Sequence, residues 1–303
     1  KEHTAVCNIA SISLKACVDT NAVISKPFMR EIQKTLEKLQ RIKEKDPPDD
    51  ESYHDPGSTA SGDSCPSIDT QSNEGGQLDN PGEESPPAGL KSNPSNGSAT
   101  KKNHVARSNP KTPGANQRRA EKAQEATWER ALRDAESLVY KMFKINTLQR
   151  TVRAAVRVLD QVVDITYSPC PKARKSNARN RALAIGASGF HDALLILKIP
   201  FDSELADIAS RIAMENIHYA ASEESQYRAR TKGACEAHRN SQMSKGLFQH
   251  NLWDIVEASS GRDKTRLTLS WAGLNKKIET NGMRNSLLTG VAPTQTSSKV
   301  AGN

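Results

Sequence analysis

Residues 176–195 read SNARNRALAIGASGFHDALL, and this stretch carries the strongest indication of the fold. Ala182–Ile185 is a short apolar run, which is typical of a buried strand. Gly186 and Gly189 follow the run, and glycines at such places permit a tight turn and a close approach of another backbone. His191–Lys198 then has the spacing of a short helix. The stretch therefore predicts a strand, a turn and a helix in succession.

The segments on either side of this stretch continue the alternation. Ile145–Val163 carries apolar residues at three- and four-residue steps, which predicts a long helix. Ser176–Arg181 is polar and basic and predicts a turn, whereas Leu205–Ala220 predicts a second long helix that Asp202 or Ser203 can cap. Thr4–Leu14 is a further apolar run with the composition of a buried strand. Short strands that alternate with amphipathic helices favour an α/β architecture with parallel strands, and the spacing does not distinguish an open sheet from a barrel.

The middle of the chain has a different composition. Ten of the fifteen prolines lie between Pro47 and Pro113. The stretch from 46 to about 117 is rich in Ser, Pro, Gly, Asn, Asp and Glu, so it buries too little apolar surface to offset its ordering entropy. We expect a disordered linker there. Phe28–Lys45 before it and Arg118–Ser137 after it have helical spacing, and both predict helices.

The chain is basic, with a net charge of +8. The Lys and Arg residues are scattered over helix faces, and no aromatic residues interleave with them to stack on single-stranded bases. We interpret the excess as a solvated basic surface rather than a nucleic-acid site, and we expect no direct binding to nucleic acid or to a membrane.

The cysteines do not form a recognised site. There are five of them, far apart and without a CxxC spacing, so neither a zinc site nor a secreted disulfide framework is indicated. No apolar run is long enough to span a membrane, and no signal peptide opens the chain. We therefore expect a reducing, cytoplasmic location and no bound metal. Because the first residue is Lys, we also expect the sequence to begin within a longer protein.

Two features carry candidate chemistry. Pro293–Ser298 places four hydroxyl side chains directly after a proline, and hydroxyls with backbone N–H groups at a helix start can surround a phosphate. On spacing alone a simple capping turn is the commoner arrangement. Cys7 lies in an apolar run without a neighbouring base, and in isolation such a cysteine is more often an inert buried thiol.

Four separated segments, in the same order, resemble the large subunit of class I ribonucleotide reductase. Residues 5–14 (AVCNIASISL) resemble the strand that holds one of that family's redox-active cysteines. Residues 176–195 resemble the family's SN-x-R-x-R-x-x-x-IG-x-x-G stretch, and residues 244–253 (SKGLFQHNLW) resemble a segment that usually reads close to SKGILQYDMW. Residues 282–303 (GMRNSLLTGVAPTQTSSKVAGN) resemble the segment that ends in the substrate-phosphate loop.

The resemblance implies part of a ten-stranded α/β barrel with a long disordered insertion. Residues 1–19 would start the barrel fragment with the redox-cysteine strand, and residues 139–303 would continue the catalytic domain. Residues 20–138 would be an insertion, in which amphipathic helices flank the linker at about 46–117. Whether this insertion is expressed as protein is left open by the sequence.

The resemblance also implies a mechanism, the radical-based reduction of ribonucleoside diphosphates to deoxyribonucleotides for DNA synthesis. Cys7 would be one member of the redox-active cysteine pair, whose partner lies upstream of this chain. The substrate diphosphate would be bound by Thr294, Gln295, Thr296 and Ser297, although the local sequence departs from the commoner PTAST form. The other four cysteines have no counterpart in the family's redox set.

The remaining parts of the enzyme would lie outside this chain. The resemblance implies a metal-containing small subunit that supplies the radical, thioredoxin or glutaredoxin as reductant, and a homodimer of large subunits. The radical cysteine and the ATP or dNTP effector sites are expected upstream, and the radical-relay tyrosines and the reducing cysteine tail downstream. The chain alone is therefore expected to be inactive, with no cofactor of its own.

Two rival interpretations stay open at this point. One is a catalytically inactive reductase homologue that acts as an interaction or regulatory protein, which the long insertion motivates. The other is a class II, cobalamin-dependent reductase, which shares the barrel chemistry. The SKGLFQHNLW segment at 244–253 favours class I.

Overall fold

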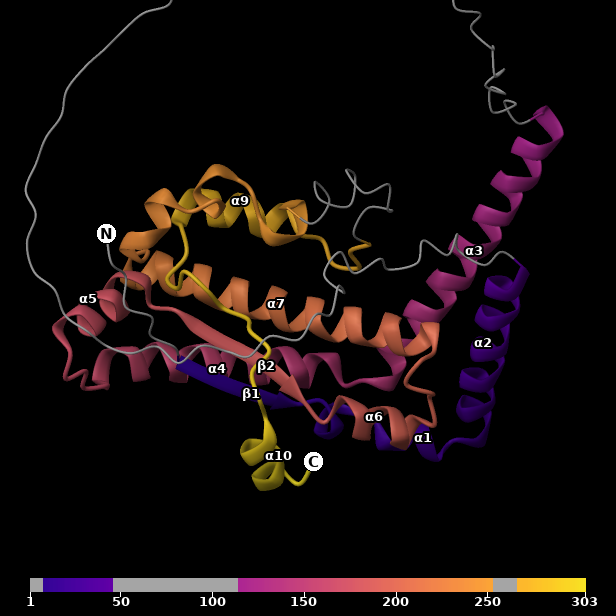
Figure 1. Ribbon diagram of the computed structural model, residues 1–303, viewed down its shortest axis with the longest axis horizontal. Helices are drawn as coiled ribbons and strands as arrows, with labels where there is room; N and C mark the ends of the chain where they lie inside the picture. The colour runs from indigo at the N-terminus through magenta and orange to yellow at the C-terminus, as the bar shows by residue number, and fades with distance from the viewer. Residues whose placement is uncertain (1–7, 46–113, 253–265) are drawn as a thin grey trace, which may run out of the picture. The chain divides into compact units, whose positions relative to one another are not determined.

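The computed structural model describes residues 8–45, 114–252 and 266–303. Nearly all of them fall in one compact unit, made of residues 1–48 and 119–303. In chain order the helices and strands are β1 (Asn8–Ser13), a 3-10 turn (Lys15–Cys17), α1 (Thr20–Ile24), α2 (Lys26–Lys45), α3 (Ala115–Met142), α4 (Ile145–Ile165), α5 (Pro171–Asn180), β2 (Leu183–Ser188), α6 (Phe190–Leu197), α7 (Glu204–Lys232), 3-10 turns at Glu236–Asn240 and Met243–Lys245, α9 (Ala272–Asn281) and α10 (Gln295–Ala301) (Figure 1).

The two strands pair in parallel, as the alternation of strands and helices predicts. Asn8 is opposite Leu183, and Ser13 is opposite Ser188. A third segment, residues 287–290, pairs with β2 through one isolated parallel bridge between Thr289 and Ile185, and we call this segment the third strand. The described residues thus contain a small parallel sheet. The ten-stranded barrel stays a prediction.

Helix α4 packs against both strands of the sheet, and α7 packs against α4 (Figure 1). The apolar positions that predict α4 are its buried face, including Val152, Val156 and Val163. Helix α7 begins where expected, and the Ser203 hydroxyl caps it by accepting a hydrogen bond from the Ala206 N–H. Capping satisfies an N–H group that the first helical turn cannot pair internally. These two helices are confirmed.

Two expectations about local structure need correction. Ser176–Arg181 does not form a turn, because residues up to Asn180 belong to helix α5, which starts with Pro171 at its first position. Proline is favoured there because its fixed φ suits a helix and it has no N–H to leave unpaired. Helix α3 begins at Ala115, so the last residues of the linker expected over about 46–117 are helical. Residues 46–113 lie outside the described residues.

The helix expected over Phe28–Lys45 is α2, and it packs on the rest of the unit through one side. Ile32 and Leu39 are buried to about 1% exposure. An ion pair between Lys43 and Glu204 joins α2 to the first turn of α7. Arg211 and Arg266 both bind Glu136, which joins α3 to α7 and to the segment before α9. No helix in the three described stretches has the length and apolar character needed to cross a membrane.

A buried carboxylate on α4 holds several of these elements together. Asp160 is fully buried, and its Oδ1 accepts hydrogen bonds from Arg181 Nε and Nη2 at 2.9 and 2.7 Å. Its Oδ2 accepts hydrogen bonds from Arg228 Nε and Nη2 at 2.9 and 2.7 Å. Asn285 Nδ2 donates to Asp160 Oδ1 at 3.3 Å and to the Arg181 carbonyl at 3.0 Å. One carboxylate thereby connects α4, the end of α5, α7 and the segment that leads to the third strand.

The arginines also control the ionisation of Asp160. Burial by itself would raise the pKa of this carboxyl, but the hydrogen bonds and charges of Arg181 and Arg228 outweigh burial and hold the pKa below its ordinary value. The folded state therefore favours the ionised form. The stabilisation is present above the unfolded-state pKa and is lost as the pH falls through the lower folded-state pKa.

We predict that Asp160→Asn lowers the free energy of unfolding by about 3–5 kcal/mol, because the buried guanidinium of Arg228 loses its counter-charge and that of Arg181 is left with the half-exposed Asp164. Urea unfolding at pH 7 measures the loss. Asp164→Asn is the matched control, since the Asp164 side chain is 46% exposed and binds only Arg181 Nη1. It should cost less than about 1 kcal/mol. Equal losses in the two variants would contradict the central role of Asp160.

Candidate functional site

The chain segment that leads to the candidate site crosses close to strand β2. Ile185 N–H donates to the Leu288 carbonyl at 2.9 Å, and Gly290 N–H donates to the Ile185 carbonyl at 3.2 Å. The chain then passes so close to β2 that a Cβ atom at Gly186 would lie 2.6 Å from the Gly290 carbonyl oxygen. Only glycine leaves room for this crossing. The predicted close backbone approach at Gly186 is confirmed.

The hydroxyl-rich turn predicted as an anion cradle lies at the start of α10. Thr294 is the residue before the helix, and its carbonyl accepts a hydrogen bond from the Ser298 N–H at 2.7 Å. The Ser297 hydroxyl donates to the same carbonyl at 3.2 Å. Gln295, Thr296 and Ser297 are exposed to solvent. The first turn of a helix leaves backbone N–H groups without intrahelical partners, so this turn offers both hydroxyl and N–H donors to an anion.

The opposite end of α10 is attached to the carboxyl ends of both strands. The Ser13 hydroxyl at the end of β1 donates to Asn303 Oδ1 at 2.8 Å. Asn303 Nδ2 donates to the Ser188 hydroxyl at the end of β2 at 3.0 Å. Lys15 Nζ donates to the Gly302 carbonyl at 2.6 Å. The hydroxyl-rich turn is therefore held near the carboxyl edge of a parallel sheet, which is where α/β proteins place their ligands.

Cys7, the predicted redox residue, lies outside the described residues. Its neighbour Asn8 is described and is fixed at the amino end of β1. Asn8 Nδ2 donates to Asn177 Oδ1 at 3.2 Å and to the Ala182 carbonyl at 3.0 Å. The described residues do not define the separation between Cys7 and residues 294–297. We expect Cys7 and residues 294–297 to face one cavity, and this stays a prediction.

The other described cysteines differ in their environments. Burial raises the pKa of the Cys17 thiol, and burial also raises the pKa of the Cys235 thiol. A buried thiol with a raised pKa is a poor nucleophile at neutral pH because little thiolate is present. Cys170 is exposed, and Cys65 lies outside the described residues. In the part of the chain that the structure describes, no group of three His, Cys, Asp or Glu side chains could hold a metal ion.

A histidine packs behind the third strand. His218 of α7 contacts the Thr289 hydroxyl through Nδ1 at 3.3 Å. Its ring centroid lies 5.4 Å from that of Trp271, and His250 packs against the other side of this cluster at 4.9 Å from Trp271. Burial, together with the charge that His250 would carry, lowers the pKa of His218 to about 4. The ring is therefore neutral at pH 7.

Sequence reasoning missed the residues that hold these segments in place. Asp160 lies within the apolar stripe of α4, between Leu159 and Val163, and a charged residue in that position was the available signal. Glu215 has a similar role on α7. Its carboxylate accepts hydrogen bonds from the N–H groups of Thr268 and Leu269 and from the Trp271 indole. Nothing in the local sequence marks Glu215 as the acceptor for a segment about fifty residues away.

Comparison with known families agrees with this arrangement. The family described as ribonucleotide reductase, barrel domain, matches residues 131–303, which is more than half of the chain. The chain belongs to this family. The matched range contains α4, β2, the third strand and the hydroxyl-rich turn, and it ends with Asn303. Residues 1–130, including Cys7, β1 and α2, lie outside it.

Several curated proteins are similar to the chain. Ribonucleoside-diphosphate reductase large subunit of monkeypox virus is 35% identical over 161 residues, which are 53% of this chain and 20% of that protein. The large chain from Schizosaccharomyces pombe is 34% identical over 160 residues, covering 53% and 19%. The large subunit from Danio rerio is 33% identical over 162 residues, again covering 53% and 19%. The chain spans about a fifth of the length of these relatives.

We predict that Gly186→Ala destabilises the chain by about 1–3 kcal/mol, because the new methyl group meets a backbone oxygen that cannot move aside by a rotamer change. Thermal unfolding measures the loss. Gly273→Ala in α9 is the control, since a Cβ there meets nothing within 4 Å. Alanine also favours a helix over glycine, so the control should be neutral or slightly stabilising. Unchanged stability of Gly186→Ala would contradict the crossing.

We predict that the imidazole of His218 titrates with a midpoint near 4, well below the ordinary value of 6.5. NMR titration of its carbon-bound ring protons measures the midpoint. Between these two pH values the unfolded chain binds a proton that the folded chain excludes, so stability falls as the pH is lowered through this window. His218→Gln should flatten that dependence. A midpoint near 6.5 in the folded chain would show that the packing does not keep the ring neutral.

Proposed function

We propose that this chain is part of the large subunit of a ribonucleoside-diphosphate reductase and contributes the diphosphate anchor of its active site. The observation that carries the proposal is the family match over residues 131–303, which includes the hydroxyl-rich turn. Curated relatives in viruses, yeast and fish are named as large subunits or chains of that enzyme. The substrate class would be ribonucleoside diphosphates, which the enzyme converts to deoxyribonucleotides for DNA synthesis.

The proposed anchor consists of Thr294, Gln295, Thr296 and Ser297. The positive end of the helix dipole and the free N–H groups of the first turn favour a negatively charged ligand. Ser297 donates its hydroxyl proton to the Thr294 carbonyl in this structure, so it would turn to a phosphate oxygen when a ligand binds. Fixing a remote phosphate positions the ribose for reaction and converts binding energy into orientation.

Cys7 is proposed as one thiol of the redox pair, with its partner outside this chain. The two thiols would be oxidised to a disulfide, and their two electrons and two protons would allow the substrate 2′-hydroxyl to leave as water, replaced by hydrogen. In β1 the side chains of Ile9, Ser11 and Ser13 alternate with the core-facing Ile12. Cys7 directly precedes β1 in the sequence, and Ser13 at the end of this strand contacts the α10 segment.

The exposed side of the sheet supports a larger barrel. Ile9 of β1 is 54% exposed, whereas parallel sheets in proteins are usually covered on both faces. We propose that the remaining strands of a ten-stranded α/β barrel complete this face, with residues 1–19 and 139–303 as barrel and residues 20–138 as an insertion.

The proposal extends to the rest of the enzyme. A metal-containing small subunit would supply the radical, thioredoxin or glutaredoxin would reduce the disulfide, and two large subunits would form a homodimer in the cytoplasm. ATP and dNTP effectors would bind elsewhere in the subunit. The chain itself would hold no cofactor, and without the remaining parts it would not turn over.

The test uses the complete subunit with its small subunit and thioredoxin, and it follows CDP reduction. Cys7→Ser should abolish multiple turnover while CDP binding persists, because the dithiol electrons are lost. Ser297→Ala should raise KM for CDP by about tenfold or more, as expected for one lost hydrogen bond to a charged group. Sustained turnover by Cys7→Ser with thioredoxin would refute its assignment.

Ser298→Ala provides the matched control for the anchor. Ser298 is the next residue, and its hydroxyl donates to the Gln295 carbonyl at 3.1 Å. Ser298 is outside the proposed anchor, so the KM of the Ser298→Ala variant for CDP should match that of the unaltered enzyme. Equal effects of the two serine substitutions would show that helix α10, rather than an anchor at Ser297, determines KM.

A further inference from the structure

Helix α2 carries a continuous stripe of positive charge. Arg30, Lys34, Lys38, Arg41 and Lys45 follow one another at steps of three or four residues, which places them on one side of a helix with 3.6 residues per turn. All five are exposed, and we call them the basic stripe. Projected around the helix axis at 100° per residue, they span an arc of about 80° that contains no acidic residue.

Most of this charge is not neutralised within the described part of the chain. Lys38 pairs with Asp134 of α3 at 2.7 Å, and Arg41 lies 3.7 Å from Glu37. Arg30, Lys34 and Lys45 have no acidic partner among the described residues. By contrast, the buried arginines Arg181 and Arg228 of the family-matched region both bind Asp160, and Arg181 also binds Asp164. The scattered charge that the sequence indicates is therefore gathered, on α2, into one face.

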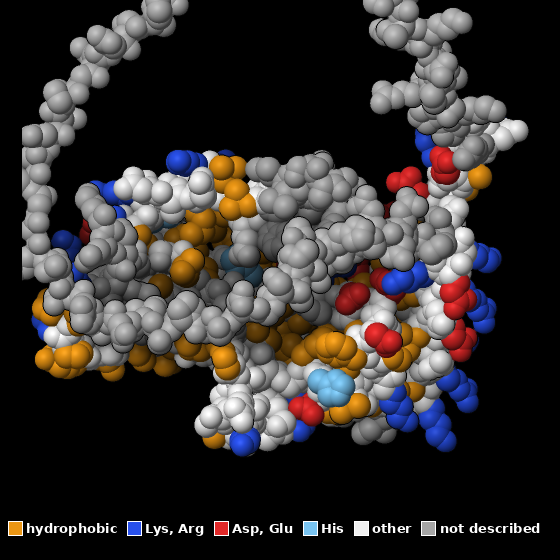
Figure 2. Space-filling view, in the orientation of Figure 1, with side chains coloured by type: hydrophobic (Ala, Val, Ile, Leu, Met, Phe, Trp, Pro, Cys, Tyr) orange, Lys and Arg blue, Asp and Glu red, His pale blue; other side chains and the backbone are white. Residues whose placement is uncertain are grey.

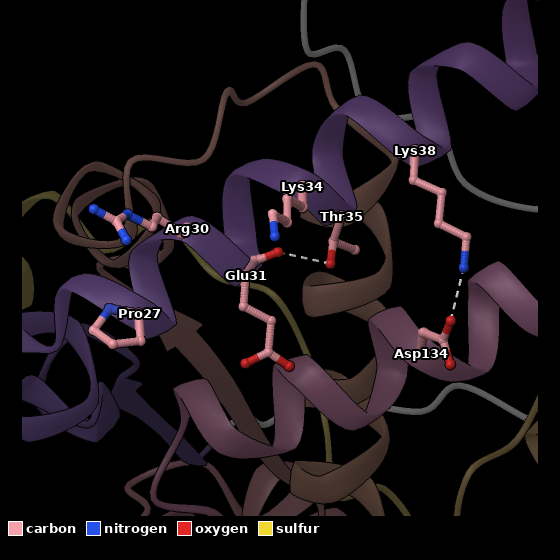
Figure 3. Close-up of a pocket in the computed structure, with 7 residues that line it drawn as sticks. All are labelled: Pro27, Arg30, Glu31, Lys34, Thr35, Lys38 and Asp134. Atoms are coloured by element: carbon pink, nitrogen blue, oxygen red, sulfur yellow. Dashed lines mark hydrogen bonds and ion pairs between the residues drawn. The ribbon is translucent and has the colours of Figure 1, made fainter.

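The stripe borders an open groove between α2 and α3 (Figure 3). The groove has a volume of about 420 Å³, and its lining includes Arg30, Lys34 and Lys38, together with Pro27 and Thr35. Its acidic members are already engaged, because Asp134 binds Lys38 and Glu31 binds Lys141 at 3.1 Å. In the space-filling view, Lys and Arg side chains lie along the side of the unit where α2 lies, with Asp and Glu side chains among them (Figure 2). An anion entering the groove would meet cations that lack partners.

We propose, against the expectation drawn from the sequence, that the basic stripe of α2 binds the phosphate backbone of duplex nucleic acid, without reading its sequence. Helix α2 lies outside the range that matches the reductase family, and none of the proposed anchor residues 294–297 lines the groove. Arg30 and Lys45 are fifteen residues apart, or about 22 Å along the helix. A duplex carries one charge per 1.7 Å of its axis, so this length faces several phosphates at once.

Other anionic partners fit the surface less well. A membrane would need the apolar side of α2, but Ile32 and Leu39 on that side are buried in the core. A protein interface needs an apolar centre, and none of the large exposed apolar side chains of the described residues lies on α2 or α3. Single strands bind through stacking on aromatic rings, and α2 presents no exposed aromatic side chain. Binding to the regular array of phosphates on a duplex requires only positive charge on the protein, and the release of counterions drives it.

The test measures fluorescence anisotropy of a labelled mixed-sequence duplex of about 20 base pairs, titrated with the whole chain at several salt concentrations. Binding should weaken with salt at a slope of about −3 or steeper in a log–log plot, since each neutralised phosphate contributes about −0.9. The triple variant Arg30→Gln, Lys34→Gln, Lys45→Gln should bind at least about tenfold more weakly and lose most of that slope. Circular dichroism verifies that the variant is folded.

The matched control removes the same charge elsewhere, with Lys175→Gln, Lys232→Gln and Lys276→Gln, all exposed and within the family-matched region. It should bind almost as tightly as the unaltered chain. Equal losses in the two variants would show that net charge, not the stripe, attracts the duplex, and the proposal would be wrong. Tighter binding to a single strand of the same length, or displacement of the duplex by polyglutamate at matched charge, would also overturn it.

Discussion

The contact between Asp160 and its two arginines is the constraint on which the rest of the described fold depends. Its oxygens receive four hydrogen bonds from Arg181 and Arg228, and the three residues come from three different parts of the chain. Burying these charges is costly unless every one of them is paired. The need to pair these charges therefore constrains how α4 packs against α7 and where β2 lies. Asn285 adds the third-strand segment to the same cluster.

This network gives a structural meaning to two of the segments that resemble the reductase family. The second arginine of SNARNR is Arg181, and the asparagine of RNSLL is Asn285. Both act on Asp160, away from the hydroxyl-rich turn. Asn177 of the first segment holds the start of β1 through Asn8. Much of the resemblance therefore lies in residues that position strands, while the proposed substrate contacts occupy only four residues at the start of α10.

The sequence predicts the helices that bury one face, because apolar residues then recur at regular steps. Helices α4 and α7 each bury a long stripe, so their apolar residues recur every three or four positions and reveal them. Helix α5 shows no such pattern, because Ser176–Arg181 is polar. Contacts that Asn177 and Arg181 make with distant residues hold it in place. The segment at 287–290 is equally hidden. It is too short to show alternation, and its pairing with β2 depends on backbone groups that every residue has.

For the candidate site, composition alone indicates the hydroxyl-rich turn that we propose as an anion site, since its hydroxyls are close together in the sequence. Its location is a different matter. Asn303, Ser13 and Ser188 come together from positions up to 290 residues apart, and no local pattern announces such a contact. The close approach at Gly186 was predictable because a glycine within a strand often marks a place where another backbone comes near. The segment that approaches Gly186, which contains Gly290, was not predictable.

The crossing of Gly290 over Gly186 has a consequence for how this region can vary. A Cβ at Gly290 would itself lie 3.1 Å from the Ala184 side chain. Three small residues therefore share one confined space, and the tolerance of each for a bulkier replacement depends on the other two. Substitutions at neighbouring sites of this kind are not additive. Evolution or a designer could enlarge this junction only by moving the strand-to-helix connection as a whole, and with it the turn that begins α10.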